Sequence, residues 1–181
     1  MKTENLVRFL NSFGAQVKKE SRELLKQAKG DTALGKSIRF EVAIEPQGFS
    51  TKFYMEDYGT FLDKGVSGNV KGQSFTNYKG EGKISPYKYT SKGPPIDILS
   101  KWIKKKGIKP KGLGRGRSKN TGQYISAFAY LISRKIKREG IKSLSFFQIP
   151  LGIGLKEVKD KMLKELKLDI ESYLTTYYRP K

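Results

Sequence analysis

The sequence predicts an α+β fold, in which long amphipathic helices pack on a small antiparallel sheet. Three patterns in the chain of 181 residues indicate it. Apolar residues recur at helical spacing in residues 4–29 and again in residues 155–177, whereas residues 37–56 alternate with the period of two that half-buried strands show. Two shorter helical patterns lie in the centre of the chain. A chain of this length suits one domain, and we expect residues 1–181 to form a single unit.

The N-terminal helix is predicted over residues 4–29. Its apolar residues stack at spacings of three, four and seven, and Gly30 follows as a C-terminal cap. The predicted buried stripe consists of Leu6, Leu10, Phe13, Val17, Leu24 and Ala28.

An antiparallel hairpin is predicted near residues 37–56. Its first strand, residues 37–44, alternates apolar and polar side chains, and the sequence Glu-Pro-Gln-Gly of residues 45–48 supplies a turn. The alternating apolar series contains Ile38, Phe40, Val42 and Ile44 in the first strand and Phe49, Thr51, Phe53 and Met55 in the returning strand.

Residues 66–95 show no period and are rich in Gly, Lys and Tyr. A segment of this length without secondary structure is unusual in a compact domain, and it is commonly either functional or disordered. We interpret it as an insertion. Its tyrosines, Tyr78, Tyr87 and Tyr89, are candidates for stacking on bases or on a neighbouring protein chain. The alternative is a mobile surface loop.

Three further helices are predicted after this insertion. They cover residues 96–106, residues 123–139 with Gly140 as the terminating residue, and residues 155–177, and the segment 143–150 before the last one is predicted to be extended. Their apolar faces comprise Ile96, Leu99, Trp102 and Ile103, then Tyr124, Phe128, Leu131, Ile132 and Ile136, and finally Leu155, Val158, Met162, Leu166, Ile170 and Leu174.

Composition excludes several kinds of chemistry. The chain has 37 Lys and Arg against 17 Asp and Glu, a formal charge of +20, and it contains neither Cys nor His. It therefore has no disulfide framework, no thiolate nucleophile, no imidazole base and no cysteine or histidine ligand for zinc. An enzyme of this composition would have to work with carboxylates, Lys, Tyr, Ser or Thr. We expect no cofactor, and a protein made and folded in a reducing cytoplasm, with neither a signal peptide nor a membrane span.

The positive charge is concentrated in the centre of the chain. Residues 98–138 contain 13 Lys and Arg and no acid, and nine of these cations lie within residues 101–119. Like charges at this density repel one another unless a polyanion or an acidic protein neutralises them. We therefore expect residues 104–122 to form a basic linker that meets such a partner, although a loosely ordered solvated loop is the alternative. The cations assigned to this contact are Lys101, Lys104, Lys105, Lys106, Lys109, Lys111, Arg115 and Arg117.

Two motifs suggest enzymatic chemistry, but their context argues against it. Residues 30–37, GDTALGKS, match the phosphate-loop pattern, yet a helix precedes them and a strand follows, the reverse of the order that directs backbone amides at a phosphate. We interpret them as a helix-to-strand turn and expect no nucleotide. Glu41 with Glu45, and Glu56 with Asp57, are candidate carboxylate pairs for a metal-dependent nuclease or a glycosidase. A solvated or structural role is the favoured interpretation of both pairs, and we expect no metal site.

The order of several segments resembles the neck and tail-completion proteins of tailed bacteriophages. The resemblance covers most of residues 1–65 and 96–178. The segments that carry it are YMEDYGT (54–60), ILSKWIKKKGI (98–108), AFAYLISRKIKREGI (127–141) and SLSFFQIPL (143–151). The insertion at residues 66–95 is a departure, because it is longer than expected of the short members of that family.

The resemblance implies a structural virion protein without enzymatic activity, which forms a ring at the joint between head and tail. The implied partners are other copies of the chain, neighbouring connector, portal or tail proteins, and packaged double-stranded DNA. A ring of strongly basic subunits requires such neighbours to neutralise it. Candidates for subunit contact are Tyr54, Tyr58, Phe61, Tyr87, Phe146 and Phe147, for which a role in the core is the alternative. The rival function is an accessory protein that binds nucleic acid non-specifically through residues 101–119.

Overall fold

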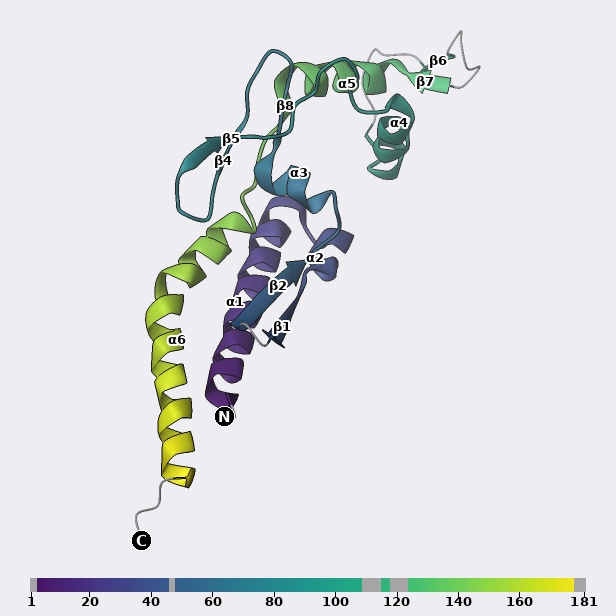
Figure 1. The fold of residues 1–181 in the computed structure, drawn as a ribbon. Coiled ribbons are helices and arrows are strands. Elements are labelled where there is room, and N and C mark those ends of the chain that lie inside the picture. The colour runs from purple at the N-terminus through teal and green to yellow at the C-terminus, as the bar shows by residue number, and fades with distance from the viewer. Residues whose placement is uncertain (1–2, 46–47, 109–114, 118–123, 178–181) are drawn as a thin grey trace. The chain divides into compact units, whose positions relative to one another are not determined.

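The computed structural model describes residues 3–45, 48–108, 115–117 and 124–177. Within these ranges the chain forms six helices and several short strands, which pair in small two-stranded antiparallel sheets (Figure 1). The α+β class predicted from the sequence is confirmed.

The chain divides into two compact units, whereas the sequence predicted a single domain. Unit 1 contains residues 1–63, 76–82 and 144–181, and unit 2 contains residues 64–75 and 83–143. The segment 66–95, interpreted as one insertion, is therefore shared between the two units.

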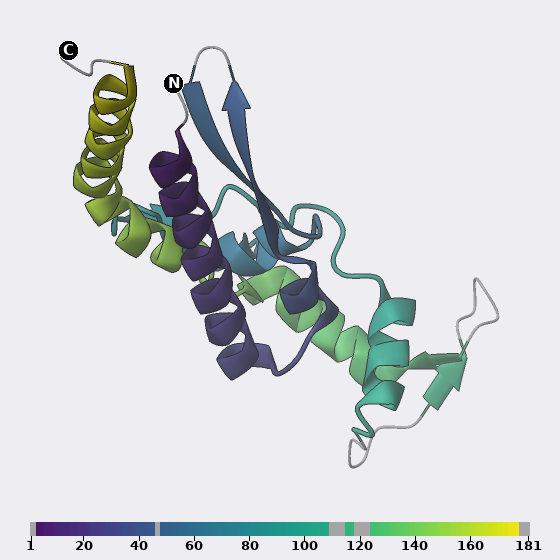
Figure 2. The same cartoon turned by 90° about the horizontal axis from the view of Figure 1, so that it is seen from below.

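Two long helices form the frame of unit 1. Helix α1, Glu4–Lys29, lies antiparallel to α6, Gln148–Tyr177, so that the beginning of α1 and the end of α6 lie at the same end of the pair (Figures 1 and 2). The predicted bounds of α1 are confirmed, and the backbone N–H of Gly30 caps it by donating to Lys26 O at 2.7 Å.

The buried stripe of α1 differs from the predicted one at its C-terminal end. Its buried residues are Leu6, Leu10, Gly14, Val17, Ser21 and Leu25. Beyond Val17 the stripe continues in steps of four, so that Leu25 is buried while Leu24 is only half-buried and Ala28 is exposed.

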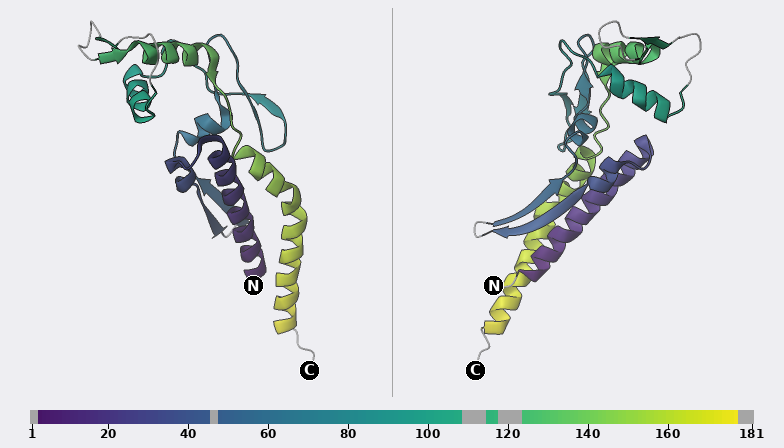
Figure 3. Two further views of the ribbon diagram at one scale, coloured as in Figure 1. Left: turned by 180° about the vertical axis from the view of Figure 1, so that it is seen from behind. Right: turned by 90° about the vertical axis from the view of Figure 1, so that its right-hand side faces the viewer.

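The predicted hairpin is present. Strand β1, Arg39–Glu45, pairs with β2, Gly48–Tyr54, in an antiparallel register that sets Phe40 opposite Phe53, and the two strands run as a ribbon beside α1 (Figure 3). The predicted turn includes residues 46 and 47, which lie outside the described residues. Ahead of the hairpin, the segment interpreted as a turn contains a short helix, α2, Ala33–Ser37, whose first residues are capped by the Thr32 side chain.

The core of unit 1 is built around Phe146. Buried Leu25, Leu34, Ile38 and Phe146 form one cluster, and the half-buried residues packed against it are Leu24, Met55, Leu62, Leu144 and Phe147. A second group of rings extends the core along α1: Phe53 contacts Phe147 and Phe13 edge to face, with ring centroids 5.4 and 6.2 Å apart.

Two buried carboxylates attach these elements to one another. Asp169 of α6 accepts the backbone N–H groups of Asn5 and Leu6 at 3.1 and 3.0 Å, at the beginning of α1. Asp63, at the end of α3, Gly59–Lys64, accepts the N–H of Phe147 at 2.8 Å, at the beginning of α6. Each carboxylate satisfies helix N–H groups that have no intrahelical partner, and its negative charge lies at the positive end of the helix dipole.

Helix α6 begins seven residues earlier than predicted. The sequence indicated an extended segment to residue 150, but the contact with Asp63 starts the helix at Gln148, and Pro150 falls in the first turn, where a missing N–H is tolerated.

The predicted buried stripe of α6 is also wrong in part, since Leu155, Ile170 and Leu174 are exposed. The buried position along this part of α6 is Asp169.

Unit 2 contains helices α4, Ile96–Lys105, and α5, Ala127–Glu139. Strand β6, Arg115–Arg117, pairs with β7, Tyr124–Ser126, and this pairing explains why α5 begins at residue 127 rather than at the predicted residue 123. The segment expected to be a basic linker therefore includes a strand.

The segment 66–95, for which the sequence predicted no secondary structure, contains short strands. It contains β3, Val66–Ser67, β4, Ser74–Thr76, and β5, Gly82–Ile84, of which β4 and β5 form one two-stranded sheet. Strand β3 pairs with β8, Gly140–Ile141. Ser67 also exchanges backbone hydrogen bonds with Tyr87 and Tyr89 at 2.7 and 2.8 Å, so β3 is bonded on both sides. Burial raises the pKa of the Tyr89 phenol.

The Asp169 cap should contribute measurably to stability. In Asp169→Asn an amide nitrogen replaces one acceptor oxygen, leaving backbone N–H donors at the start of α1 without a partner, at a cost of about 1–3 kcal/mol. Urea denaturation followed by helical circular dichroism should show a lower midpoint. The matched control is Asp160→Asn, an exposed position on the same helix. Equal midpoints for the two variants would contradict the capping role.

Gly140 should be indispensable to unit 2. Its φ is +83°, and a Cβ there would lie 2.1 Å from the carbonyl oxygen of Val66 across the β3–β8 pair. We expect Gly140→Ala to destabilise unit 2 by about 1–3 kcal/mol or more. Fluorescence of Trp102 in α4 reports the transition. Gly72→Ala is the control, since a Cβ at Gly72 meets nothing within 4 Å, and a comparable loss there would refute the steric explanation.

Candidate polyanion-binding surface

The two units differ sharply in charge. Unit 2 carries 19 Lys and Arg against 2 acids, a formal charge of +17, whereas unit 1 carries 18 against 15, a formal charge of +3. This difference in charge arises because the fold groups three basic stretches in unit 2. They are the predicted basic segment and the basic residues around positions 64–92 and 134–142. Unit 2 is therefore the candidate site for a polyanion.

Helix α4 carries the first lysines of the predicted basic segment. Lys101, Lys104 and Lys105 are exposed on it, and Lys106 is exposed immediately after its end. The helix is amphipathic: Ile103 is buried, while the Trp102 side chain between the lysines is 44% exposed. An exposed indole among cations is the combination that stacks on bases beside bound phosphates.

These cations have no internal counter-charge. Within the described part of the chain, Lys101, Lys104, Lys105, Arg134 and Lys135 form no ion pair with a carboxylate. Arg134 and Lys135 are exposed on α5, where the Arg134 guanidinium lies over the Tyr130 ring at 5.8 Å. Their charges therefore remain available to an external anion.

The other predicted basic residues are placed only in part. Arg115 and Arg117 belong to β6, whereas Lys109 and Lys111 lie outside the described residues. In addition, unit 2 brings Arg134, Lys135 and Arg138 of α5 into the same compact unit. The sequence places these three cations in the acid-free region, but its pattern did not assign them to a contact.

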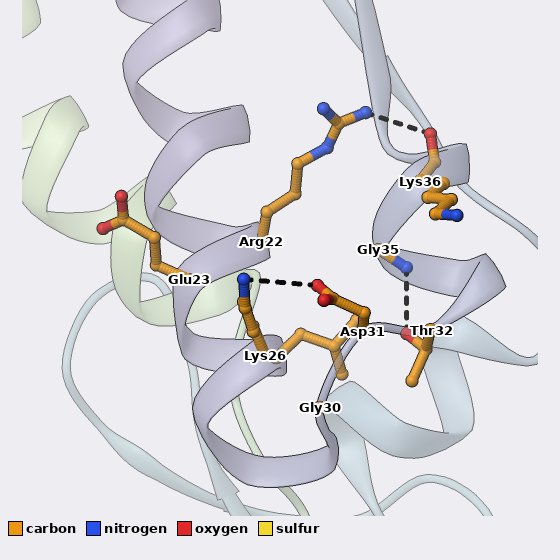
Figure 4. Close-up of a pocket in the computed structure, with 9 residues that line it drawn as sticks. Arg22, Glu23, Lys26, Gly30, Asp31, Thr32, Gly35 and Lys36 are labelled. Carbon is orange, nitrogen blue, oxygen red and sulfur yellow. Dashed lines mark hydrogen bonds and ion pairs between the residues drawn. The ribbon is translucent and has the colours of Figure 1, made fainter.

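Residues 30–37 match the phosphate-loop sequence pattern, but their backbone does not have the arrangement of a phosphate loop. Figure 4 shows that Gly35 donates its backbone N–H to Thr32 Oγ1, at 3.1 Å, and that Lys26 pairs with Asp31 at 3.5 Å. The adjoining cavity has a volume of about 230 Å³. Since the helix after Thr32 has five residues and α1 rather than a strand precedes it, the amides are not arranged around a phosphate as in a phosphate loop.

The candidate catalytic carboxylates are dispersed. Glu45 pairs with Lys52 across the hairpin at 3.1 Å and raises the pKa of that lysine, and Glu56 and Asp57 are exposed after β2. Within the described ranges, no group of three or more acidic side chains could hold a metal ion. The fully buried Asp63 and Asp169 are used as helix caps.

The predicted contact residues fall into two groups. Tyr54, Tyr58 and Phe61 are exposed around the end of the hairpin and in α3, and Tyr87 is half-buried in unit 2. Phe146 lies in the core of unit 1, which is the alternative role, and Phe147 is half-buried against Phe53. The exposed group, Tyr54, Tyr58 and Phe61, has the solvent accessibility that subunit contact requires.

Helix α6 has an exposed apolar surface that its sequence pattern did not predict. The large apolar side chains exposed on this helix are Ile149, Ile153, Leu155, Leu163, Leu168, Ile170, Tyr173 and Leu174. The signal in the sequence was the number of apolar residues in 148–177, which exceeds what one buried stripe requires.

Comparison of the chain with protein-family models, with curated proteins and with solved structures finds no match. Among the residues that the structure describes, no helix has the length and hydrophobicity needed to span a membrane.

The charge on α4 should determine part of the affinity for DNA. We expect the triple variant Lys101→Gln, Lys104→Gln and Lys105→Gln to weaken duplex binding. The slope of log K against log salt should become shallower by about 0.9 for each phosphate that the variant no longer neutralises. Fluorescence anisotropy across a salt series measures both quantities.

The matched control removes three exposed lysines from α6, with the substitutions Lys156→Gln, Lys159→Gln and Lys164→Gln. Glutamine and lysine have similar helix propensities, so both triple variants should retain their helices. An equal change of slope in the two variants would show that net charge alone, rather than unit 2, governs binding.

Proposed function

We propose that this protein is a structural virion protein of a tailed bacteriophage, which assembles as a ring at the joint between head and tail. In this role unit 2 faces packaged DNA, and copies of the chain meet through unit 1. The observation that carries the proposal is the partition of charge, with +17 of the +20 in one compact unit.

The unequal distribution of charge between the units supports a protein that binds a polyanion through one unit and other copies of itself through the other. Subunits that met through unit 2 would bring together two surfaces of high positive charge, and these would repel one another strongly at low salt. Unit 1, at +3, has no such obstacle. Packaged DNA is the favoured partner for unit 2, because duplex DNA carries one negative charge per about 1.7 Å of its axis.

The exposed face of α6 supports assembly through unit 1. Leu163, Ile170 and Leu174, spaced by seven and four residues, lie along one flank of the helix and are 53%, 41% and 52% exposed. The helix carries five Lys and five Asp or Glu, so its formal charge is zero. A neutral helix with an exposed apolar flank can pack against a neighbour without charge repulsion.

The resemblance of the sequence to neck and tail-completion proteins supports the same role, since those proteins also act through interfaces. The protein would then be made in the bacterial cytoplasm and incorporated into the particle.

A nucleic-acid-binding accessory protein is the second candidate. The exposed Trp102 among the lysines of α4 favours it, because an aromatic side chain beside cations suits single strands as well as duplexes. Self-association distinguishes the two candidate functions. An accessory protein would bind DNA as a monomer, whereas the ring protein would also self-associate.

Self-association and its dependence on salt test the ring. Sedimentation velocity at 0.15 and 0.5 M NaCl should show discrete oligomers whose fraction rises with salt, because salt screens the repulsion between unit 2 surfaces. Binding to DNA should fall over the same range. A protein that stays monomeric at both salt concentrations, at high protein concentration and with duplex DNA present, would not be a ring subunit.

Substitution on α6 tests the face through which copies meet. Leu163→Lys should weaken association about tenfold or more, because withdrawing a leucine from an apolar contact costs about 1.5–3 kcal/mol. Leu168→Lys is the control. It lies five residues further along α6, about 140° around the helix, and its exposure of 42% is similar. Equal effects of the two substitutions would rule out the flank that contains Leu163.

A further inference from the structure

Unit 1 has a second cavity, which the proposed ring does not use. It has a volume of about 500 Å³ and is formed by the middle of α1, the end of α2, the beginning of β1 and the end of β2. Four cations line it: Lys18, Arg22, Lys36 and Arg39. We call it the α1–β2 cleft. Its size lies in the range of ligand pockets.

The charge in the cleft is unbalanced. Glu56 and Asp57 also line it, so four positive side chains face two negative ones. None of the six forms an ion pair in the described chain. Like charges gathered in a concave surface raise the potential there, and that potential attracts a counter-ion of opposite sign.

Neutral groups, rather than carboxylates, contact three of the four cations, Lys18, Arg22 and Arg39. The Arg22 guanidinium donates to the carbonyl oxygens of Lys36 and Ile38, at 3.0 and 2.8 Å, and Figure 4 shows the first of these bonds. Arg39 lies over the Tyr54 ring at 5.0 Å, and Lys18 lies over the Phe40 ring at 5.7 Å. Carbonyl and aromatic partners orient a cation without cancelling its charge.

The wall that carries these groups is itself fixed. Ser37 Oγ donates to Leu34 O at 2.8 Å and accepts the N–H of Glu56 at 3.2 Å, so α2 is bonded to the segment that follows β2. Ile38 and Leu34 beneath this wall belong to the core. The cleft is therefore a preformed concave site in which four cations face only two carboxylates.

We propose that the α1–β2 cleft binds phosphate groups. Two guanidinium groups offer the planar fork that matches phosphate oxygens, and two lysines add point charges. A net local charge of two positive units fits a pyrophosphate-like group or two adjacent phosphates of a nucleic-acid strand. The site uses Lys36 and Ser37 of the phosphate-loop-like sequence, but as part of a side-chain cleft and not through backbone amides. It requires a single copy of the chain and is independent of the ring.

The test uses inorganic pyrophosphate and residue-resolved NMR, because unit 2 also attracts anions. Titration of the intact protein should move the backbone amide signals of residues 36–39 and 54–57 along a saturable curve. The double variant Lys36→Gln and Arg39→Gln should weaken that curve at least tenfold. The control variant Lys19→Gln and Lys29→Gln removes two exposed lysines of α1 that do not line the cleft and should leave the curve unchanged.

Two further arms identify the source of the phosphate. A short oligonucleotide that saturates the same signals at lower concentration than pyrophosphate assigns the cleft to a nucleic-acid backbone, and the reverse order assigns it to a free phosphate compound. No saturable change at residues 36–39 and 54–57 with either probe overturns the proposal. So does an equal loss in the control variant, or saturation by a glutamate-rich peptide where both phosphate probes fail. Because a monomer suffices, failure to form rings leaves this test unaffected.

Discussion

Mutual repulsion among the cations of unit 2 is the constraint on which the rest of the molecule depends. Nineteen positive side chains and two negative ones share that unit, and they cannot neutralise one another. The unit is held together by interactions that do not depend on charge. These are the backbone bonds on both sides of Ser67, the β3–β8 pair closed at Gly140, and the packing of Ile103 and Ala129. In the proposed function the counter-charge comes from packaged DNA, which carries closely spaced negative charges along its axis.

The same constraint gives unit 1 a different set of tasks. Unit 1, whose charge is nearly balanced, buries two carboxylates, Asp63 and Asp169, which accept backbone N–H groups at the beginnings of α6 and α1. Buried acids are common in catalytic sites, but here each accepts backbone N–H groups at a helix end, which is a structural use. The neutral helix α6 leaves an apolar flank exposed. In the proposed function, unit 1 serves as the assembly module and unit 2 as the polyanion-binding module.

The local sequence pattern predicted the lysines of α4 as part of the candidate site, but it did not predict the contribution of α5. The acid-free run that includes α4 identified Lys101, Lys104 and Lys105 as unpaired cations, because a long absence of acids can be read along the chain. The order of elements around the phosphate-loop-like sequence was also predicted, since α1 precedes it and β1 follows it. The α1–β2 cleft was not predicted. Its cations come from α1, α2 and β1, and only folding brings Lys18 of one helix beside Arg39 of a strand.

The sequence by itself determined the class of fold, the bounds of α1, the β1–β2 hairpin and the excess of positive charge, because helical and strand periods, capping glycines and composition are properties of neighbouring residues. Tertiary structure decided the features that join distant residues. It moved the start of α6 to Gln148 through Asp63, exposed Leu155, Ile170 and Leu174 by burying Asp169, and divided the segment 66–95 between two units. The physical reason is the same in each case: a buried position is defined by what packs against it, and that partner lies far away in the chain.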